Sequence, residues 1–281
     1  MTVTITDIQK KKTSGEKITM LTAYDYSMAR LIDQARVDMV LVGDSLGMVA
    51  LGYSSTVPVT MEEMLHHCRA VSRGVRHSFL VGDMPYLSYQ VSEEEAVRNA
   101  GLFIKTAGCH GVKLEGGSES VPAIEKITRA GIPVMGHIGL TPQTATALGG
   151  YSVQGKDVES GRKLVEDAQA VSDAGVFAIV LECIPSPLAA LITETVPIPT
   201  VGIGAGNHCD GQVLVTNDLL GLYDKFTPGF VKKYADLAPV IRKALSEYVR
   251  EVEDGGFPDD EHSFRGSDAV MAEIISGMKN G

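Results

Sequence analysis

Six ionisable side chains each follow a short apolar run, and groups of these types could bind a divalent cation, hold an anionic substrate or move a proton. Carboxylates supply metal ligands and bases, a lysine pairs with an anion, and a histidine changes charge near neutral pH. Burying a carboxylate costs several kcal/mol unless a cation or hydrogen bonds compensate it. The six groups are Asp44 in VGDS, Asp83 in VGDMP, Lys113 and Glu115 in VKLEGG, His137 in GHIG and Glu182 in LEC.

The spacing of these groups indicates a metal site shared by several strands. Lys113 and Glu115 are two positions apart, so both point to one side of the same strand. Most of the other intervals have the length of one strand-and-helix unit, which assigns the remaining groups to different strands. One lysine cannot neutralise four acids, whereas a divalent cation can, and oxygen ligands favour a hard ion such as Mg²⁺.

Two further points bear on this interpretation. Ser45, directly after Asp44, offers a hydroxyl or a backbone N–H to an anionic substrate. Any single acid could instead cap a helix or lie in a surface loop. A coincidence across four strands is much less favoured, so we expect one polar site.

Eight apolar runs rich in Val, Ile and Leu recur along the chain, and continuous runs are typical of strands buried on both faces. Helical patterns separate them, as in 60–74, 92–108 and 159–175, where Ser92 and Glu95 have capping-box spacing and Gly74, Gly108 and Gly175 stand at expected helix ends. The expected strands lie within 17–25, 39–45, 78–85, 111–117, 132–139, 177–183, 198–206 and 212–220.

Strand followed by helix, eight times over, predicts a (β/α)8 TIM barrel, an α/β fold in which chemistry occurs at the carboxyl ends of the strands. An open doubly wound sheet is the alternative, but no G-x-G-x-x-G follows the first strand. We expect a single barrel domain over residues 1–264. Residues 265–281 form a C-terminal extension that is either helical or disordered.

Composition limits the partners and the compartment. A formal net charge of −10 and a pI near 5.2 argue against nucleic acid and against anionic membranes. The four cysteines lie far apart without C-x-x-C spacing, which favours a reduced, cytoplasmic setting. The N-terminal stretch lacks the apolar core of a signal peptide, and no uninterrupted apolar run approaches about 18 residues.

Several weaker features have ordinary explanations. His66 and His67, adjacent on an expected helix, make a poor metal pair and are expected at the surface or in packing. The GIGAG loop at 202–206 could take an anion on its backbone N–H groups, or could merely shape a turn. Cys183 and Met48 are expected to be buried packing residues.

Longer motifs resemble the 3-methyl-2-oxobutanoate hydroxymethyltransferase family, also called ketopantoate hydroxymethyltransferases. The resemblance extends from about Thr22 to Phe264. The lead-in to VGDMP and the C-terminal extension depart from the family pattern, but neither contains a matched functional residue. The motifs are TAYDYSMARLIDQARVDMVLVGDSLGMVALGYSSTVPVTMEEMLHH, VGDMPYLSY, VKLEGG, GHIGLTPQ, GGYSVQGK, LEC, IPTVGIGAGNHCDGQVLV and EHSF.

The resemblance implies transfer of a hydroxymethyl group from 5,10-methylenetetrahydrofolate to 3-methyl-2-oxobutanoate. The products would be 2-dehydropantoate and tetrahydrofolate, in the synthesis of pantothenate and coenzyme A. It also implies a Mg²⁺-dependent barrel that assembles as a homodecamer. By matching motifs, the metal residues would be Asp44, Asp83 and Glu115; the oxo acid would meet Asp44, Ser45, Asp83 and Lys113; and Glu182 would be the proton acceptor.

This chemistry is consistent with the residue types. A 2-oxo acid can chelate Mg²⁺, which then stabilises the charge of an enolate. Glu182, at the end of an apolar run, is suited to remove the C3 proton. Lys113 can hold the substrate carboxylate, and His137 could bond the new hydroxyl or orient a ligand. The resulting enolate would attack the methylene carbon of the folate.

Two other functions remain open from the sequence. A Mg²⁺-dependent lyase or mutase of the phosphoenolpyruvate mutase and isocitrate lyase group would share the barrel and the chelation, but its K-K-C-G motif is absent. A catalytically silent barrel that binds a ligand or serves assembly is the other. The intact set of candidate residues argues against lost activity.

Overall fold

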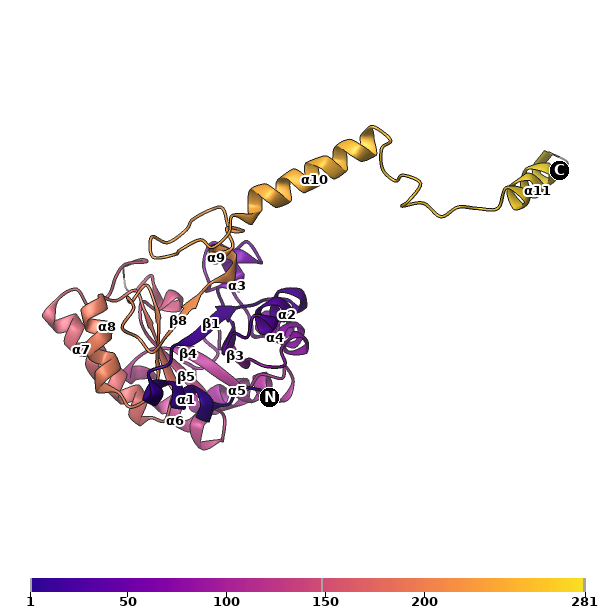
Figure 1. The fold of residues 1–281 in the computed structure, drawn as a ribbon. Helices are drawn as coiled ribbons and strands as arrows, with labels where there is room; N and C mark the ends of the chain where they lie inside the picture. Colours follow the sequence, from indigo (N-terminus) through magenta and orange to yellow (C-terminus); the bar gives the residue numbers. More distant parts are fainter. Residues whose placement is uncertain (1, 148, 280–281) are drawn as a thin grey trace.

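Eight parallel strands form a closed barrel in chain order in the computed structural model, which describes residues 2–147 and 149–279 (Figure 1). All eight predicted strands are therefore confirmed, and the open sheet is excluded. The strands are β1 (Ile18–Thr22), β2 (Met39–Val42), β3 (Phe79–Asp83), β4 (Gly111–Glu115), β5 (Val134–Gly139), β6 (Ala178–Glu182), β7 (Thr200–Ile203) and β8 (Gly211–Leu214).

Helices cover the outside of the barrel, and one expected helix is missing. The chain passes from β7 to β8 through residues 204–210, a link too short and glycine-rich for a helix, so the expected eightfold alternation is wrong there. The longer helices around the strands are α1 (Ile5–Ser14), α2 (Tyr26–Gln34), α4 (Met61–Gly74), α5 (Glu93–Lys105), α6 (Val121–Arg129), α7 (Val158–Asp173) and α8 (Ser186–Thr195). The short ones are α3 (Leu46–Val49), η1 (Ser118–Ser120), η2 (Pro142–Thr144) and α9 (Thr216–Leu219).

The three helices predicted in most detail are present, with one difference. The Ser92 side chain caps α5 by accepting from the Glu95 N–H, and Gly108 and Gly175 adopt left-handed backbone after their helices. Gly74 is the last residue of α4, as expected, but its backbone is not left-handed, and a Cβ there would come within 2.8 Å of the Tyr26 carbonyl of α2. Gly74 therefore stands at the predicted helix end and also allows α2 and α4 to pack closely.

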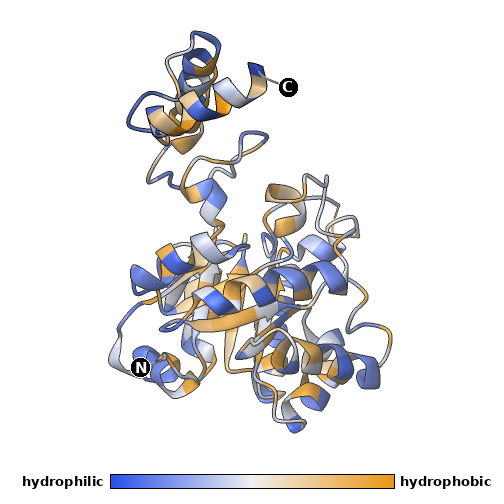
Figure 2. Ribbon diagram, turned by 90° about the vertical axis from the view of Figure 1, so that its right-hand side faces the viewer, coloured by the Kyte–Doolittle hydropathy of each residue, from blue (hydrophilic) through white to orange (hydrophobic). Residues whose placement is uncertain are grey.

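Alternate residues along each strand serve two separate cores. One core fills the space between strands and helices, with Leu80, Val112 and Phe103 fully or almost fully buried. The other fills the barrel interior, with Val81 and Met135. In Figure 2 the strands are coloured largely orange, which marks hydrophobic residues. The same alternation carries the polar residues at the strand ends into the barrel, directly above the inner apolar layers.

The inner core is closed at the amino ends of the strands by the first helix. Ile8 of α1 is completely buried and packs in the interior cluster with Ile18 and Phe177. The capping box of Thr4 and Asp7 fixes the start of α1. The amino end is therefore sealed, and the carboxyl ends remain available for ligands.

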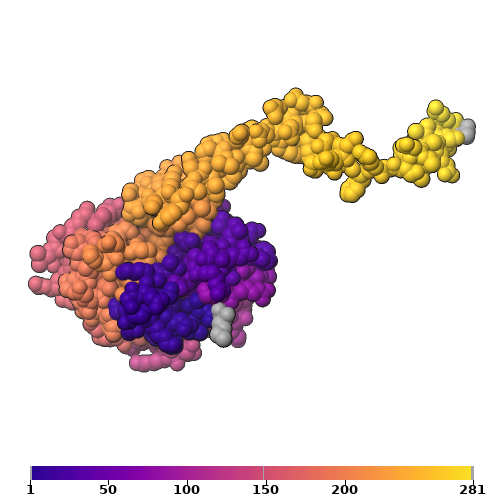
Figure 3. All heavy atoms as spheres, in the orientation of Figure 1, coloured from indigo at the N-terminus to yellow at the C-terminus, as the bar shows by residue number. Residues whose placement is uncertain are grey.

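The chain leaves the barrel after α9 as a C-terminal arm, residues 237–279, made of α10 (Leu237–Glu253) and α11 (Asp268–Lys279). The arm projects from the body of the molecule (Figures 1 and 3), and neither helix contains a buried residue. The chain thus leaves the barrel at α10, before residue 264. The domain boundary after residue 264 remains a prediction. Across the described residues, no helix is long and apolar enough to cross a membrane.

Candidate active site

Strand register places the candidate residues at one level in the mouth of the barrel. Asp83 of β3 is paired with Lys113 of β4, and Glu115 of β4 with His137 of β5. Glu182 ends β6 beside the end of β5. These side chains belong to the inward-facing rows that carry the apolar inner core lower in each strand. Sequence spacing therefore predicted correctly that they lie together.

Lys113 is the central cation of this cluster. Its Nζ lies 2.9 Å from Asp83 Oδ1, 3.2 Å from His137 Nδ1 and 4.0 Å from Glu115 Oε1. Burial alone would favour the neutral amine, but the surrounding carboxylates raise the pKa of Lys113 above its ordinary value. Lys113 therefore remains charged while almost completely buried.

One lysine leaves the carboxylates incompletely compensated. Burial, followed by the charges of Asp83 and Glu115, raises the pKa of Asp44 well above its usual range. Burial also raises the pKa of Asp83, although Lys113 opposes the shift. Glu115 differs, because its contacts with His137 and Lys113 outweigh burial and lower its pKa. Ionisation is thus least favourable at Asp44 and Asp83, which hold their protons more tightly than ordinary aspartates do.

His137 connects this cluster to Glu182. The ring Nδ1 lies 3.5 Å from Glu115 Oε1, and Nε2 lies 3.2 Å from Glu182 Oε2. Burial and Lys113 favour the neutral ring, but the contacts with both glutamates outweigh them and raise the pKa of His137 to about 9. The two glutamates therefore favour the protonated ring, which can donate to them, whereas Lys113 opposes it.

A glycine permits the close approach of Glu182 and His137. Gly139, at the end of β5, adopts φ of 98°, and a Cβ there would lie 2.2 Å from the Glu182 carbonyl oxygen. The Leu140 N–H donates to that same oxygen at 2.9 Å. The backbone at the end of β5 thus fixes the position of Glu182, while its carboxylate remains partly exposed to the cavity.

A hydrogen-bond network around Gln143, a residue for which no role was predicted, holds two of the acids. Gln143 Nε2 donates to Asp44 Oδ2 at 2.9 Å, and its backbone N–H donates to Glu115 Oε2 at 3.0 Å. The hydroxyl of Tyr89 lies 2.9 Å from Gln143 Oε1. Both residues stand in the quoted motifs GHIGLTPQ and VGDMPYLSY, so motif membership was the available signal.

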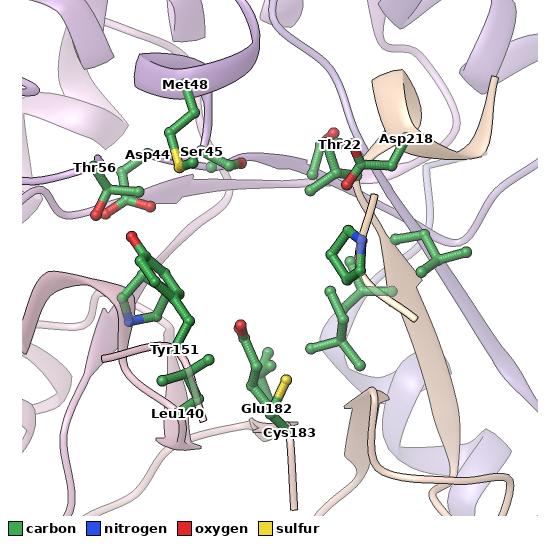
Figure 4. Close-up of a pocket in the computed structure, with 18 of the residues that line it drawn as sticks. Thr22, Asp44, Ser45, Met48, Thr56, Leu140, Tyr151, Glu182, Cys183 and Asp218 are labelled. Atoms are coloured by element: carbon green, nitrogen blue, oxygen red, sulfur yellow. The ribbon is translucent and has the colours of Figure 1, made fainter. Parts of the chain in front are cut away.

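A cavity of about 460 Å³ opens above these residues, with walls of two kinds (Figure 4). We call one side the acidic end, and Figure 4 shows Asp44 and Ser45 there. The Ser45 hydroxyl is paired with Tyr24 at 2.9 Å. The members of the acidic end are Asp44, Ser45, Asp83, Lys113, Glu115 and His137.

The other side, the aromatic end, carries one carboxylate among apolar groups. Asp218 of α9 lies beside Thr22 there, and Glu182 and Cys183 lie between the two ends (Figure 4). Sequence reasoning missed Asp218, although it stands in the predicted eighth run. The chain after α9 adds Tyr223, Phe226, Phe230 and Val231 to the lining of the same cavity, and we call Asp218 together with these four residues the aromatic end.

Three of the weaker expectations are tested by these positions. Cys183 and Met48 line the cavity, so their prediction as buried packing residues is wrong. The backbone of Cys183 has left β6 with φ of 48°. Burial and Glu182 raise the pKa of the Cys183 thiol to about 12, so it is not a thiolate nucleophile. Gly204 of the GIGAG loop lies against the Phe230 ring, which indicates a packing role.

The adjacent histidines have the structural roles that were expected. His66 is exposed at the surface of α4. His67 is half-buried, and its Nδ1 lies 2.6 Å from the Tyr24 carbonyl oxygen. His67 thus joins α4 to the chain after β1.

The acidic end suits a hard divalent cation. Within 2–147 and 149–279, no three His, Cys, Asp or Glu side chains form a ready metal cluster. Mg²⁺, however, commonly uses one or two carboxylates and completes its shell with water and substrate oxygens. Among the described residues, Asp83 Oδ1 has only Lys113 Nζ beside it, at 2.9 Å, and the Asp44 carboxylate points into the cavity (Figure 4). The raised pKa values of this pair indicate a site that a cation would stabilise.

A closed parallel barrel with an ionisable cluster at its carboxyl ends defines an enzyme of the (β/α)8 class. A model of the family "Ketopantoate hydroxymethyltransferase" matches residues 2–260. The chain belongs to this family of transferases, and the resemblance predicted from the motifs is confirmed.

Two curated relatives illustrate the match. The chain is 58% identical to the 3-methyl-2-oxobutanoate hydroxymethyltransferase of Syntrophus aciditrophicus, over 93% of this chain and 96% of the relative. It is 56% identical to the enzyme of the same name from Carboxydothermus hydrogenoformans, over 97% and 99%. Because these relatives are named as enzymes, the matches argue against a catalytically silent barrel.

Solved structures with the same fold come from the group that the sequence left as an alternative. A phosphonopyruvate hydrolase complexed with oxalate and Mg²⁺ aligns with a TM-score of 0.61 at 15% identity, covering 100% of this chain and 98% of that one. A 2,3-dimethylmalate lyase, a member of the PEP mutase/isocitrate lyase superfamily, gives 0.57 at 13%, covering 99% and 100%. At these identities the likeness concerns the fold alone.

Proposed function

We propose that this enzyme transfers a hydroxymethyl group from 5,10-methylenetetrahydrofolate to 3-methyl-2-oxobutanoate, with formation of 2-dehydropantoate and tetrahydrofolate. The observation that carries the proposal is the position of Glu182, whose carboxylate shares one cavity with Lys113 and with the Asp44–Asp83 pair. Such a cavity offers a base, a fixed cation and a place for Mg²⁺ around one small oxo acid. Membership of the family supports the choice of reaction.

The acidic end would bind the oxo acid and the metal. Asp44 and Asp83 would be direct ligands of Mg²⁺, which when bound supplies positive charge next to the developing enolate. Glu115, whose carboxylate lies beside His137 and accepts from the Gln143 N–H, would be the third metal residue. Lys113 and Ser45 are the proposed partners of the substrate carboxylate.

Glu182 would accept the proton from C3 of the substrate. Its carboxylate is partly exposed to the cavity and lies beside His137 at 3.2 Å. When it is protonated, His137 can hold Glu182 in place and can later donate a hydrogen bond to the new hydroxyl. The C3 electron pair left by proton removal forms the new bond to the one-carbon unit, and both bonds from that carbon to N5 and N10 of the folate break. One water supplies the hydroxyl oxygen, and the C3 proton and the remaining water proton go to the two folate nitrogens.

The reaction is tested by incubating the enzyme with 3-methyl-2-oxobutanoate, methylenetetrahydrofolate and Mg²⁺. We expect 2-dehydropantoate by mass spectrometry and loss of product when Mg²⁺ is chelated. Exchange of the C3 hydrogen with deuterated solvent, followed by NMR without folate, tests proton removal separately. Exchange without product would contradict the folate donor, and absence of both would contradict the whole proposal.

A homodecamer in the cytoplasm is the assembly and location that we propose. Exposed apolar residues on α10 support association with further copies, because such a face is costly in water. Sedimentation should show an assembly of about 300 kDa, ten copies of a 29.9 kDa chain. A stable monomer at micromolar concentration would contradict this. The exposed apolar residues are Val240, Ile241, Leu245, Tyr248, Val249 and Val252.

A further inference from the structure

The aromatic end of the cavity contains a buried carboxylate without a partner. Asp218 is 8% exposed, and its Oδ1 is buried without any hydrogen bond. Among the residues that the structure describes, its side chain also forms no ion pair. Figure 4 shows the carboxylate directed into the cavity beside Thr22. Asp218 therefore has acceptor oxygens that the protein itself does not use.

Local structure does not explain this carboxylate. The Asp218 backbone N–H bonds the Val215 carbonyl, and the Thr22 hydroxyl accepts from the Thr216 N–H, so neither group serves the Asp218 side chain. Burial raises the pKa of Asp218 to about 6, and exposed Lys233 opposes the shift only in part. A buried acceptor without a donor is unfavourable for folding alone, which points to a ligand.

The lining of the cavity restricts the class of ligand. The loop that follows α9 contributes aromatic side chains in Tyr223, Phe226 and Phe230 and aliphatic surface in Val231 to the cavity that Asp218 lines. Few oxygen donors accompany the carboxylate, so a bare metal ion lacks the ligands that it needs. A flat ring that carries N–H donors satisfies both the apolar walls and the acceptor. Paired N–H groups can meet both carboxylate oxygens at once.

We infer that Asp218 binds the amino-pyrimidinone ring of the one-carbon donor, accepting hydrogen bonds from its ring N–H and exocyclic amino group. This assignment rests on the proposed function, which supplies a reduced pterin as co-substrate. The oxo acid would occupy the acidic end and the pterin the aromatic end. Glu182 lies between the two ends, so the reacting carbons would meet beside the proposed base (Figure 4).

The test compares Asp218→Asn with Asp224→Asn, the same isosteric change at an exposed residue that does not line the cavity. Calorimetry measures the Kd of tetrahydrofolate, of tetrahydropterin and of the tetrahydropterin analogue without the 2-amino group. We expect Asp218→Asn to weaken the binding of tetrahydrofolate and of tetrahydropterin by at least about tenfold, and the binding of the analogue by less than about threefold. Asp224→Asn should bind all three like the wild type. Exchange of the C3 hydrogen should fall far less than pterin binding does.

Three results would overturn the inference. The first is that Asp218→Asn weakens the binding of tetrahydropterin by less than about tenfold. The second is that it weakens the binding of the analogue as much as that of tetrahydropterin. The third is that C3 exchange falls as much as pterin binding does, which would indicate general damage to the cavity. The proposed function can fail separately. If the wild type makes no 2-dehydropantoate but binds tetrahydropterin through Asp218, the inference stands and the proposed reaction is wrong. If the wild type makes 2-dehydropantoate and Asp218→Asn binds pterin normally, the reaction stands and the inference is wrong.

Discussion

The two ends of the cavity satisfy their charged groups in opposite ways. At the acidic end, Asp83, Glu115 and His137 each lie within 4.0 Å of Lys113, and Gln143 bonds two further oxygens. At the aromatic end, Asp218 has no such neighbour within the described chain. The difference indicates that the protein positions the groups of the acidic end before any ligand binds, whereas the ligand completes the aromatic end.

Replacing the proposed base should have the largest effect and should leave both ends intact. Glu182→Gln keeps the shape but cannot take a proton, so exchange of the C3 hydrogen with deuterated solvent should fall by about 10²–10⁴-fold. Binding of the oxo acid and of Mg²⁺, measured by calorimetry, should persist. Glu194→Gln, at an exposed position on α8, is the matched control.

Wild-type exchange in Glu182→Gln would remove the base assignment. Loss of both exchange and binding would mean that Glu182 is a structural group or a metal ligand. Because the two glutamates favour the protonated ring of His137, His137 would not replace Glu182 as the base without deprotonation.

A smaller effect, confined to the acidic end, is expected from Asp83→Asn. The neutral amide removes one metal ligand and the partner of Lys113, so Mg²⁺ binding and activity should weaken by at least about tenfold. Circular dichroism should show an unchanged fold, and tetrahydropterin binding at the aromatic end should change little. Metal dependence equal to that of the wild type would contradict the metal site.

The smallest expected effect is on stability and belongs to the aromatic end. Because the native pKa of Asp218 is raised to about 6, the folded state holds this proton more tightly than the unfolded state does. The stability associated with Asp218 is complete below about pH 4 and is lost as the pH rises to about 6. Asp218→Asn should thus be more stable than the wild type by roughly 1–2 kcal/mol at pH 8 and equal at pH 4.

Urea unfolding at both pH values measures this difference. Asp224→Asn, exposed to solvent, should have little effect on stability at either pH. A stability difference for Asp218→Asn that does not vary with pH would show that Asp218 has a partner in solution, and the contrast between the two ends would disappear.

The same contrast explains how far the sequence could predict the site. Asp83, Lys113, Glu115 and Glu182 end apolar runs, and the barrel brings all such ends together, so position along the chain was sufficient. Asp218 lies on a four-residue helix after β8, and the cavity that it lines is completed by the later loop that carries Phe226 and Phe230. No local pattern encodes that meeting of loop and barrel.

The fold shows the same division between local and tertiary signals. Strands buried on both faces require continuous apolar runs, so the eight strands were predictable. The role of Gly74 was not, because it depends on the approach of α2 to α4. The prediction of a helix between β7 and β8 was wrong. It assumed that strands and helices alternate throughout, although residues 204–210 have no helical pattern.

Gly139 has a consequence for the tolerance of this enzyme to mutation. Alanine is usually the mildest replacement, yet at this position its methyl group would occupy the space of the Glu182 carbonyl. The ends of β5 and β6 would have to separate, and His137 and Glu182 would lose their alignment although neither is altered. In a mutational scan, a residue without any functional group would therefore rank among the most sensitive in the active site.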